Sequence, residues 1–172
     1  MRSCTRSDRV AEYTRPATWE DVKRVARYLD EAGVEYALIG GYALAAHGLV
    51  RLTEDIDILV NPSAENSRRW IVALSRLPDG AARQLAAEPD VFSMQKSYAI
   101  RINDEITVDV LPSAGGLPWE QLRPHVHDLE IDGVLLRVLS LEGLLKTKGG
   151  ARPKDQMDAA AITRALEQLG RR

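Results

Sequence analysis

The chain has 172 residues, of which 45% are hydrophobic and 28% are charged, and its formal net charge is -2. These values fit one globular domain with a proper core, and they exclude attraction of nucleic acid or anionic membranes through overall charge alone. The single cysteine, Cys4, excludes an internal disulfide, and no apolar run reaches the roughly 20 residues that cross a bilayer.

The N-terminal segment contains arginines but lacks the apolar stretch of a secretory signal. We therefore expect a cytoplasmic protein without a membrane partner. Residues 1–16 are expected to form a flexible segment, and residues 17–172 one domain, whose C-terminal helices lie at about 140–170.

Helix and strand signals alternate along the chain. Thr18 is a candidate N-cap with Asp21 three residues later, and Gly33 ends this first helix. The segments predicted next are, in order, a strand running into a glycine turn over 34–41, a short helix over 42–48, a strand over 54–60, a helix over 67–77, one or two edge strands over 83–102, a strand over 105–112, a hairpin over 129–139, a helix over 140–150 and a last helix over 155–170. Asp132-Gly133 suits the two-residue turn of the hairpin. This order predicts the fold class α/β (α+β), with a single mixed sheet flanked by helices.

Two acids, Asp55 and Asp57, interrupt an otherwise apolar strand. Side chains two residues apart on a strand point to the same face, so the two carboxylates share one face while Ile56 and Ile58 fill the core. Close carboxylates repel each other unless a cation lies between them, and hard oxygen ligands suit magnesium or manganese. Taken alone, the pattern favours the simpler interpretation of two exposed acids on a solvent-facing strand.

Three further features favour a catalytic interpretation. Gly40-Gly41 follows an apolar strand and opens a helix, where glycines let the backbone approach a phosphate near free N–H groups. Arg51 and Thr53 precede the two acids and are placed to meet an anion. Asp109 alternates with valines in a later strand, so it also can face away from the core. Three acids on two neighbouring strands opposite a glycine turn predict two-metal phosphoryl or nucleotidyl transfer.

The densest basic cluster follows these strands. It consists of Lys146, Lys148, Arg152 and Lys154. Such charge runs are usually solvated loops, and the alternative is contact with a triphosphate or a nucleic-acid backbone. Asp155 is expected to cap the last helix, with Asp158 in its first turn.

Gly40-Gly41, thirteen intervening residues, Asp55-Ile56-Asp57 and a later strand carboxylate together resemble the DNA polymerase β-type nucleotidyltransferase superfamily. The string GGYALAAHGLVRLTEDIDI is especially similar to the branch of AbiEii-type toxins from bacterial toxin–antitoxin and abortive-infection systems and their small relatives. The string KTKGGARPKDQMD resembles a Lys/Arg-rich segment that these proteins carry after the catalytic strands. The resemblance covers residues 34–160.

The resemblance implies a nucleotidyltransferase fold and transfer of a nucleoside monophosphate from an NTP such as ATP to a hydroxyl acceptor. Asp55 and Asp57 would bind two Mg²⁺ (or Mn²⁺) ions, and Asp109 would bind the catalytic ion and help to deprotonate the hydroxyl. The residues expected to bind the nucleotide are Gly40, Gly41, Arg51, Thr53, Lys148 and Lys154. Many members have serine where this chain has Gly41, so backbone contacts would replace a hydroxyl contact here.

The acceptor implied by the resemblance is RNA, tRNA or a protein, in a toxin–antitoxin or phage-defence system with an antitoxin protein as partner. Two alternatives stay open. The same chemistry can act on a small antibiotic such as an aminoglycoside, or the fold can persist as an inactive binding or regulatory domain.

Overall fold

The computed structural model describes residues 14–88, 90–92 and 98–171. Most of the segment expected to be flexible, residues 1–13, therefore lies outside the described residues. The helices are α2 (Trp19–Glu31), α3 (Gly40–Ala46), α4 (Ala64–Leu74), α5 (Trp119–Leu122), α6 (Leu141–Lys146) and α7 (Pro153–Gly170), with 3-10 turns η1 (Ala81–Leu85) and η2 (Arg123–His125). The strands are β1 (Tyr36–Ile39), β2 (Ile56–Val60), β3 (Ile100–Asn103), β4 (Thr107–Leu111), β5 (Ser113–Ala114), β6 (Leu117–Pro118), β7 (Val126–Ile131) and β8 (Val134–Leu139).

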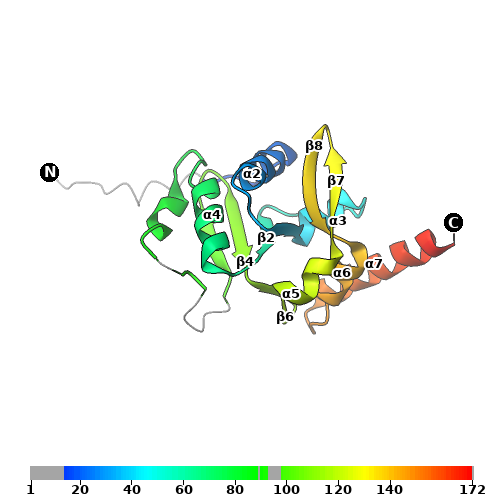
Figure 1. Cartoon of the computed structure of the whole chain (residues 1–172). Helices are drawn as coiled ribbons and strands as arrows, with labels where there is room; N and C mark the ends of the chain where they lie inside the picture. Colours follow the sequence, from blue (N-terminus) through cyan, green and yellow to red (C-terminus); the bar gives the residue numbers. More distant parts are fainter. Residues whose placement is uncertain (1–13, 89, 93–97, 172) are drawn as a thin grey trace.

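Among these residues the main sheet has six strands in the order β3-β4-β2-β1-β8-β7, and β5 and β6 form a separate small pair. The inner pairs β2–β4 and β1–β8 are parallel, whereas β1–β2 and the outer hairpins β3–β4 and β7–β8 are antiparallel. Figure 1 shows the β7–β8 hairpin in yellow on one side of the molecule and β4 in green on the other. The expected mixed α/β fold, with one main sheet and flanking helices, is confirmed.

The core forms where helices cover the buried strands. All four residues of β1 are buried, and α2 packs against α4 and β8. Trp70 of α4 is fully buried in this core. The last helix, α7, is orange to red in Figure 1 and leads away from the sheet while its first half packs on α6. Within the described ranges every helix is too short or too polar to cross a membrane.

Local sequence signals set several element ends. Thr18 and Asp21 form the expected capping box of α2, in which each side chain accepts a hydrogen bond from the other residue's backbone N–H. The turn at Asp132-Gly133 has positive φ at both residues, as a two-residue hairpin turn of this type requires. The last helix differs from the prediction, because it begins at Pro153, a residue that favours the first helical position.

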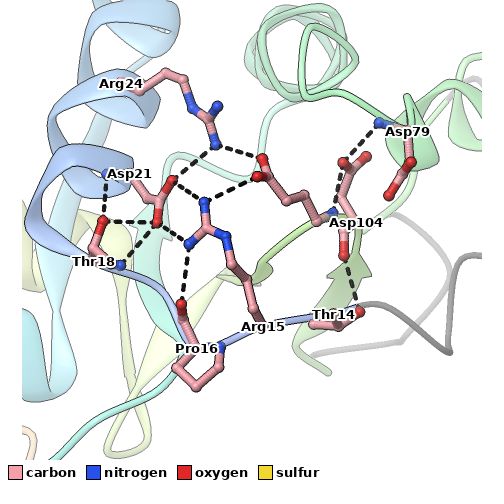
Figure 2. Close-up of polar contacts among 9 residues, drawn as sticks. Thr14, Arg15, Pro16, Thr18, Asp21, Arg24, Asp79 and Asp104 are labelled. Carbon is pink, nitrogen blue, oxygen red and sulfur yellow. Dashed lines mark hydrogen bonds and ion pairs between the residues drawn. The ribbon is translucent and has the colours of Figure 1, made fainter.

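Residues 14–16 were expected within the flexible segment, but they are anchored to the β3–β4 hairpin. The Arg15 guanidinium donates to Asp21 at 2.6 Å and to Glu105 at 3.0 Å, and the Thr14 hydroxyl donates to the Asp104 carbonyl at 2.9 Å. Figure 2 shows Arg15 and Arg24 pointing to the same Asp21 carboxylate. Burial raises the pKa of Asp21, but hydrogen bonds from Arg15 and Thr18 outweigh it and lower this pKa to about 2.

Asp104 fixes the same hairpin from inside. It is fully buried, and its carboxylate accepts hydrogen bonds from the backbone N–H groups of Asp79, Ala81 and Glu105. The hairpin is therefore fixed relative to the core, and the backbone positions from which the side chains of β3 and β4 project are fixed with it.

We expect Asp104→Ala to lower the free energy of unfolding by about 3 kcal/mol, because three backbone N–H donors lose their buried acceptor. Chemical denaturation with urea measures this value. Asp79→Ala is the matched control, since only the backbone of the exposed Asp79 contributes to the network. Equal effects of the two substitutions would show that the carboxylate of Asp104 does not hold the hairpin.

Candidate active site

Neighbouring strands bring the three predicted acids together. The parallel register of β2 and β4 pairs Asp57 with Asp109. Asp55 lies directly before β2, and all three acids line one hollow of about 680 Å³. Asp57 is half-buried, whereas the other residues of β2 are buried. The shared face predicted for Asp55 and Asp57 therefore exists, and the side chain of Asp109 opens onto it.

The three carboxylates crowd one another. Burial first, and then the negative charges of Asp109 and Asp55, raise the pKa of Asp57 to about 6. The positive charges of Arg51 and Lys148 counteract this rise only in part. The surroundings of Asp57 therefore disfavour its charged form.

Arg101, which no pattern in the sequence indicated, bridges two of the acids. It lies on β3 directly opposite Asp109 in the antiparallel register. Its Nε and Nη2 atoms donate to the two oxygens of Asp109 at 2.9 and 2.8 Å, and Nη2 also donates to Asp55 at 3.3 Å. This fork is the strong form of an arginine–carboxylate contact, and the hydrogen bonds to Asp109 raise the pKa of Arg101 above its ordinary value.

The glycine pair packs tightly against the residues of the acid motif. Gly40 has a φ of +68°, and a Cβ atom there would lie 2.3 Å from Oδ2 of Asp57. A Cβ atom on Gly41 would lie 2.5 Å from Cβ of Thr53, whose hydroxyl donates to the Asp55 carbonyl at 3.2 Å. Because these glycines have no side chains, the turn can pack directly against the segment that carries Asp55 and Asp57.

The basic residues are held by two acids of α7. Arg51 and Lys148 contact the same Asp158 carboxylate oxygen at 3.1 and 3.0 Å. Asp155 lies 3.7 Å from Lys148 and accepts a hydrogen bond from Arg152 at 2.9 Å. Both acids are buried. The expectation that Asp155 caps the last helix is wrong, because Arg152 holds the N-cap position and Asp155 lies inside the first turn.

These basic residues line a second hollow, of about 250 Å³, that adjoins the first. Gly40, Lys148 and Thr147 contribute to it. The residues common to both hollows are Arg51, Asp57, Arg152 and Lys154. Of the predicted nucleotide-binding residues, Gly41 lies beneath Thr53, and the other five line one or both hollows.

A family model described as aminoglycoside-2''-adenylyltransferase matches residues 21–162. The chain belongs to this family. It is therefore a nucleotidyltransferase, as the acid and glycine motifs predicted. The matching family is the antibiotic-modifying one, which corresponds to the alternative acceptor class and not to the toxin branch that the motif resembled most.

One of two similar solved structures supports the fold of this adenylyltransferase family member. A putative nucleotidyltransferase from Thermotoga maritima matches with a TM-score of 0.53 and 17% identity over 90% of this chain and 93% of that chain. An antigenic nucleotidyltransferase-like protein from Paracoccidioides brasiliensis matches with a TM-score of 0.46 and 17% identity over 87% of this chain and 78% of that chain. A search of curated proteins found no match.

The acids of this adenylyltransferase family member fit a hard divalent cation, although they are not already arranged around one. Among the described residues, no group of three His, Cys, Asp or Glu side chains is gathered closely enough to hold a metal ion. The donors are nevertheless all carboxylate oxygens, which Mg²⁺ and Mn²⁺ prefer. Burial and the two neighbouring carboxylates disfavour the negative charge of Asp57, and a bound cation would counter that effect. Asp55, Asp57 and Asp109 are therefore the residues that would hold such an ion.

Proposed function

We propose that the protein transfers AMP from ATP to a hydroxyl group of an aminoglycoside-like acceptor in a metal-dependent reaction. The observation that carries this proposal is that three neighbouring carboxylates line two adjoining hollows together with basic residues. Membership of the adenylyltransferase family supports ATP as the donor and favours a small antibiotic over RNA or protein as the acceptor.

In the proposed reaction the acceptor oxygen attacks the α-phosphorus of ATP, the bond between the α- and β-phosphates breaks, and pyrophosphate leaves. Asp109 accepts the proton of the attacking hydroxyl. Arg51, Lys148 and Lys154 bind the negatively charged triphosphate in the smaller hollow, and Gly40 lets the backbone approach it. Mg²⁺ or Mn²⁺, held by the three acids, would neutralise phosphate charge and activate the attacking oxygen.

In this scheme Asp155 and Asp158 hold basic side chains in position. Each makes ion pairs with basic residues of the smaller hollow while itself remaining buried. A buried carboxylate keeps a flexible lysine or arginine in one orientation, which lowers the entropy lost when the triphosphate binds.

RNA is a second candidate acceptor, and one observation favours it. The side chains of Arg101 and Arg152, which line the larger hollow, are 57% and 84% exposed. Exposed arginines at the mouth of a site can contact the phosphate backbone of an RNA strand. A toxin–antitoxin setting, with an antitoxin protein as partner, belongs to this second candidate.

ATP labelled at the α-phosphate distinguishes these acceptors. We expect label to pass to an aminoglycoside when the full-length protein is incubated with Mg²⁺ and a panel of such antibiotics, and Asp57→Asn to transfer none. Label on total RNA instead would favour the second candidate. If neither class is labelled and no pyrophosphate is released, the proposed transfer reaction is wrong.

A further inference from the structure

The catalytic carboxylates already have a cation between them, and that cation belongs to the protein. Both oxygens of Asp109 accept hydrogen bonds from Arg101, and the same guanidinium reaches Asp55. A divalent ion coordinated by these carboxylates needs oxygens at about 2.0 to 2.6 Å. The ion and the guanidinium fork therefore compete for the same oxygen atoms.

We propose that Arg101 is a displaceable counter-cation that competes with the divalent metal for Asp55 and Asp109. This inference rests on the proposed function, and it adds that metal loading requires the arginine to leave both carboxylates. Arg101 thereby sets the metal concentration at which the site fills.

The surroundings of the ion pair show which partner moves. The Asp109 side chain is 12% exposed and belongs to a strand that has neighbours on both sides, whereas the Arg101 side chain is 57% exposed. In the sheet as described, β3 is one of the two edge strands. The long arginine side chain can therefore swing into solvent without opening the core, while Asp109 stays in place to receive the ion.

A simple effect of charge must be separated from direct competition. Any cation beside the hollow repels a metal ion, but solvent weakens that repulsion. Lys154 lines the same hollow and offers a matched control, because its removal also takes away one positive charge. Arg101→Lys keeps the charge and removes the planar fork that engages both oxygens of Asp109.

Calorimetric titration of the full-length, nucleotide-free protein with Mn²⁺ tests the proposal. We expect Arg101→Gln to bind Mn²⁺ about tenfold more tightly than wild type, and Arg101→Lys to bind more tightly than wild type as well. Lys154→Gln should tighten binding by less than about threefold. The Mg²⁺ concentration that gives half-maximal transfer should fall in parallel for Arg101→Gln.

Two results would overturn the role of Arg101 while leaving the proposed function intact. One is Mn²⁺ binding that Arg101→Gln leaves unchanged or weakens, which would mean that the arginine only holds Asp109 in place. The other is equal tightening by Arg101→Gln and Lys154→Gln, which would show that charge alone acts. If wild type and every variant fail to bind Mn²⁺, both the proposed metal site and the competition are wrong.

Discussion

Asp57→Asn is expected to abolish nucleotidyl transfer and, at the same time, to raise the Tm of the metal-free protein. Activity is lost because the amide is a weaker metal ligand than a carboxylate, and we expect a fall of at least about a thousandfold. Stability rises because the substitution removes a charge that burial, Asp109 and Asp55 all disfavour. A gain of about 1 kcal/mol corresponds to roughly 2 to 4 °C in a chain of this size. Thermal unfolding in a chelating buffer at neutral pH measures it.

Asp158→Asn makes the same chemical change as Asp57→Asn, but we expect it to lower the Tm. Asp158 is also buried, but Arg51 and Lys148 neutralise it through ion pairs. Its loss leaves two basic groups without this partner, so we expect the Tm to fall by several degrees. If both variants lose stability to the same extent, Asp57 has a structural role and the crowding described here does not govern the site.

Local patterns in the sequence were sufficient to predict that the three acids lie together. Strand alternation placed Asp55, Asp57 and Asp109 away from the core, and the glycine pair marked the turn that faces them. These signals work because strand periodicity is a property of adjacent residues and does not depend on the rest of the chain.

Residues whose role depends on register or on pairing across the fold were missed. Arg101 meets Asp109 only because the β3–β4 hairpin has one particular register, which the sequence around it does not determine. Asp155 and Asp158 near the start of a helix look like ordinary end charges. Their ion pairs with Arg51 and Lys148 depend on how α7 packs beside the sheet, so no local pattern distinguishes the two roles.

The sequence motifs alone could not identify the acceptor class. The glycine and acid motifs are predicted to bind metal and triphosphate, which are the same for every acceptor. They therefore predicted nucleotidyl transfer, but the toxin branch that they resembled most is not the family that matched. The match over residues 21–162 favours the antibiotic-modifying enzymes, and it covers most of the chain and not the motifs alone.

Gly40→Ala is expected to reduce transfer by about 100-fold or more and to weaken Mn²⁺ binding. The added Cβ atom would lie 2.3 Å from Oδ2 of Asp57, so the carboxylate must shift out of position. Displacements of about 1 Å in a catalytic group can cost this much activity. The φ of +68° adds a backbone cost of about 1 to 2 kcal/mol for any residue with a Cβ atom. Transfer rates, Mn²⁺ titration and urea unfolding measure the three effects.

Gly33→Ala separates the backbone cost from the collision. Gly33 has the same φ of +68°, but nothing among the described residues lies within 4 Å of the position that its Cβ would occupy. We expect this control to lose about 1 to 2 kcal/mol of stability and to keep full transfer activity. If Gly40→Ala behaves like Gly33→Ala in all three measurements, Gly40 is required only for its backbone conformation. The larger loss expected for Gly40→Ala would mean that this glycine also leaves the space in which Asp57 is held for catalysis.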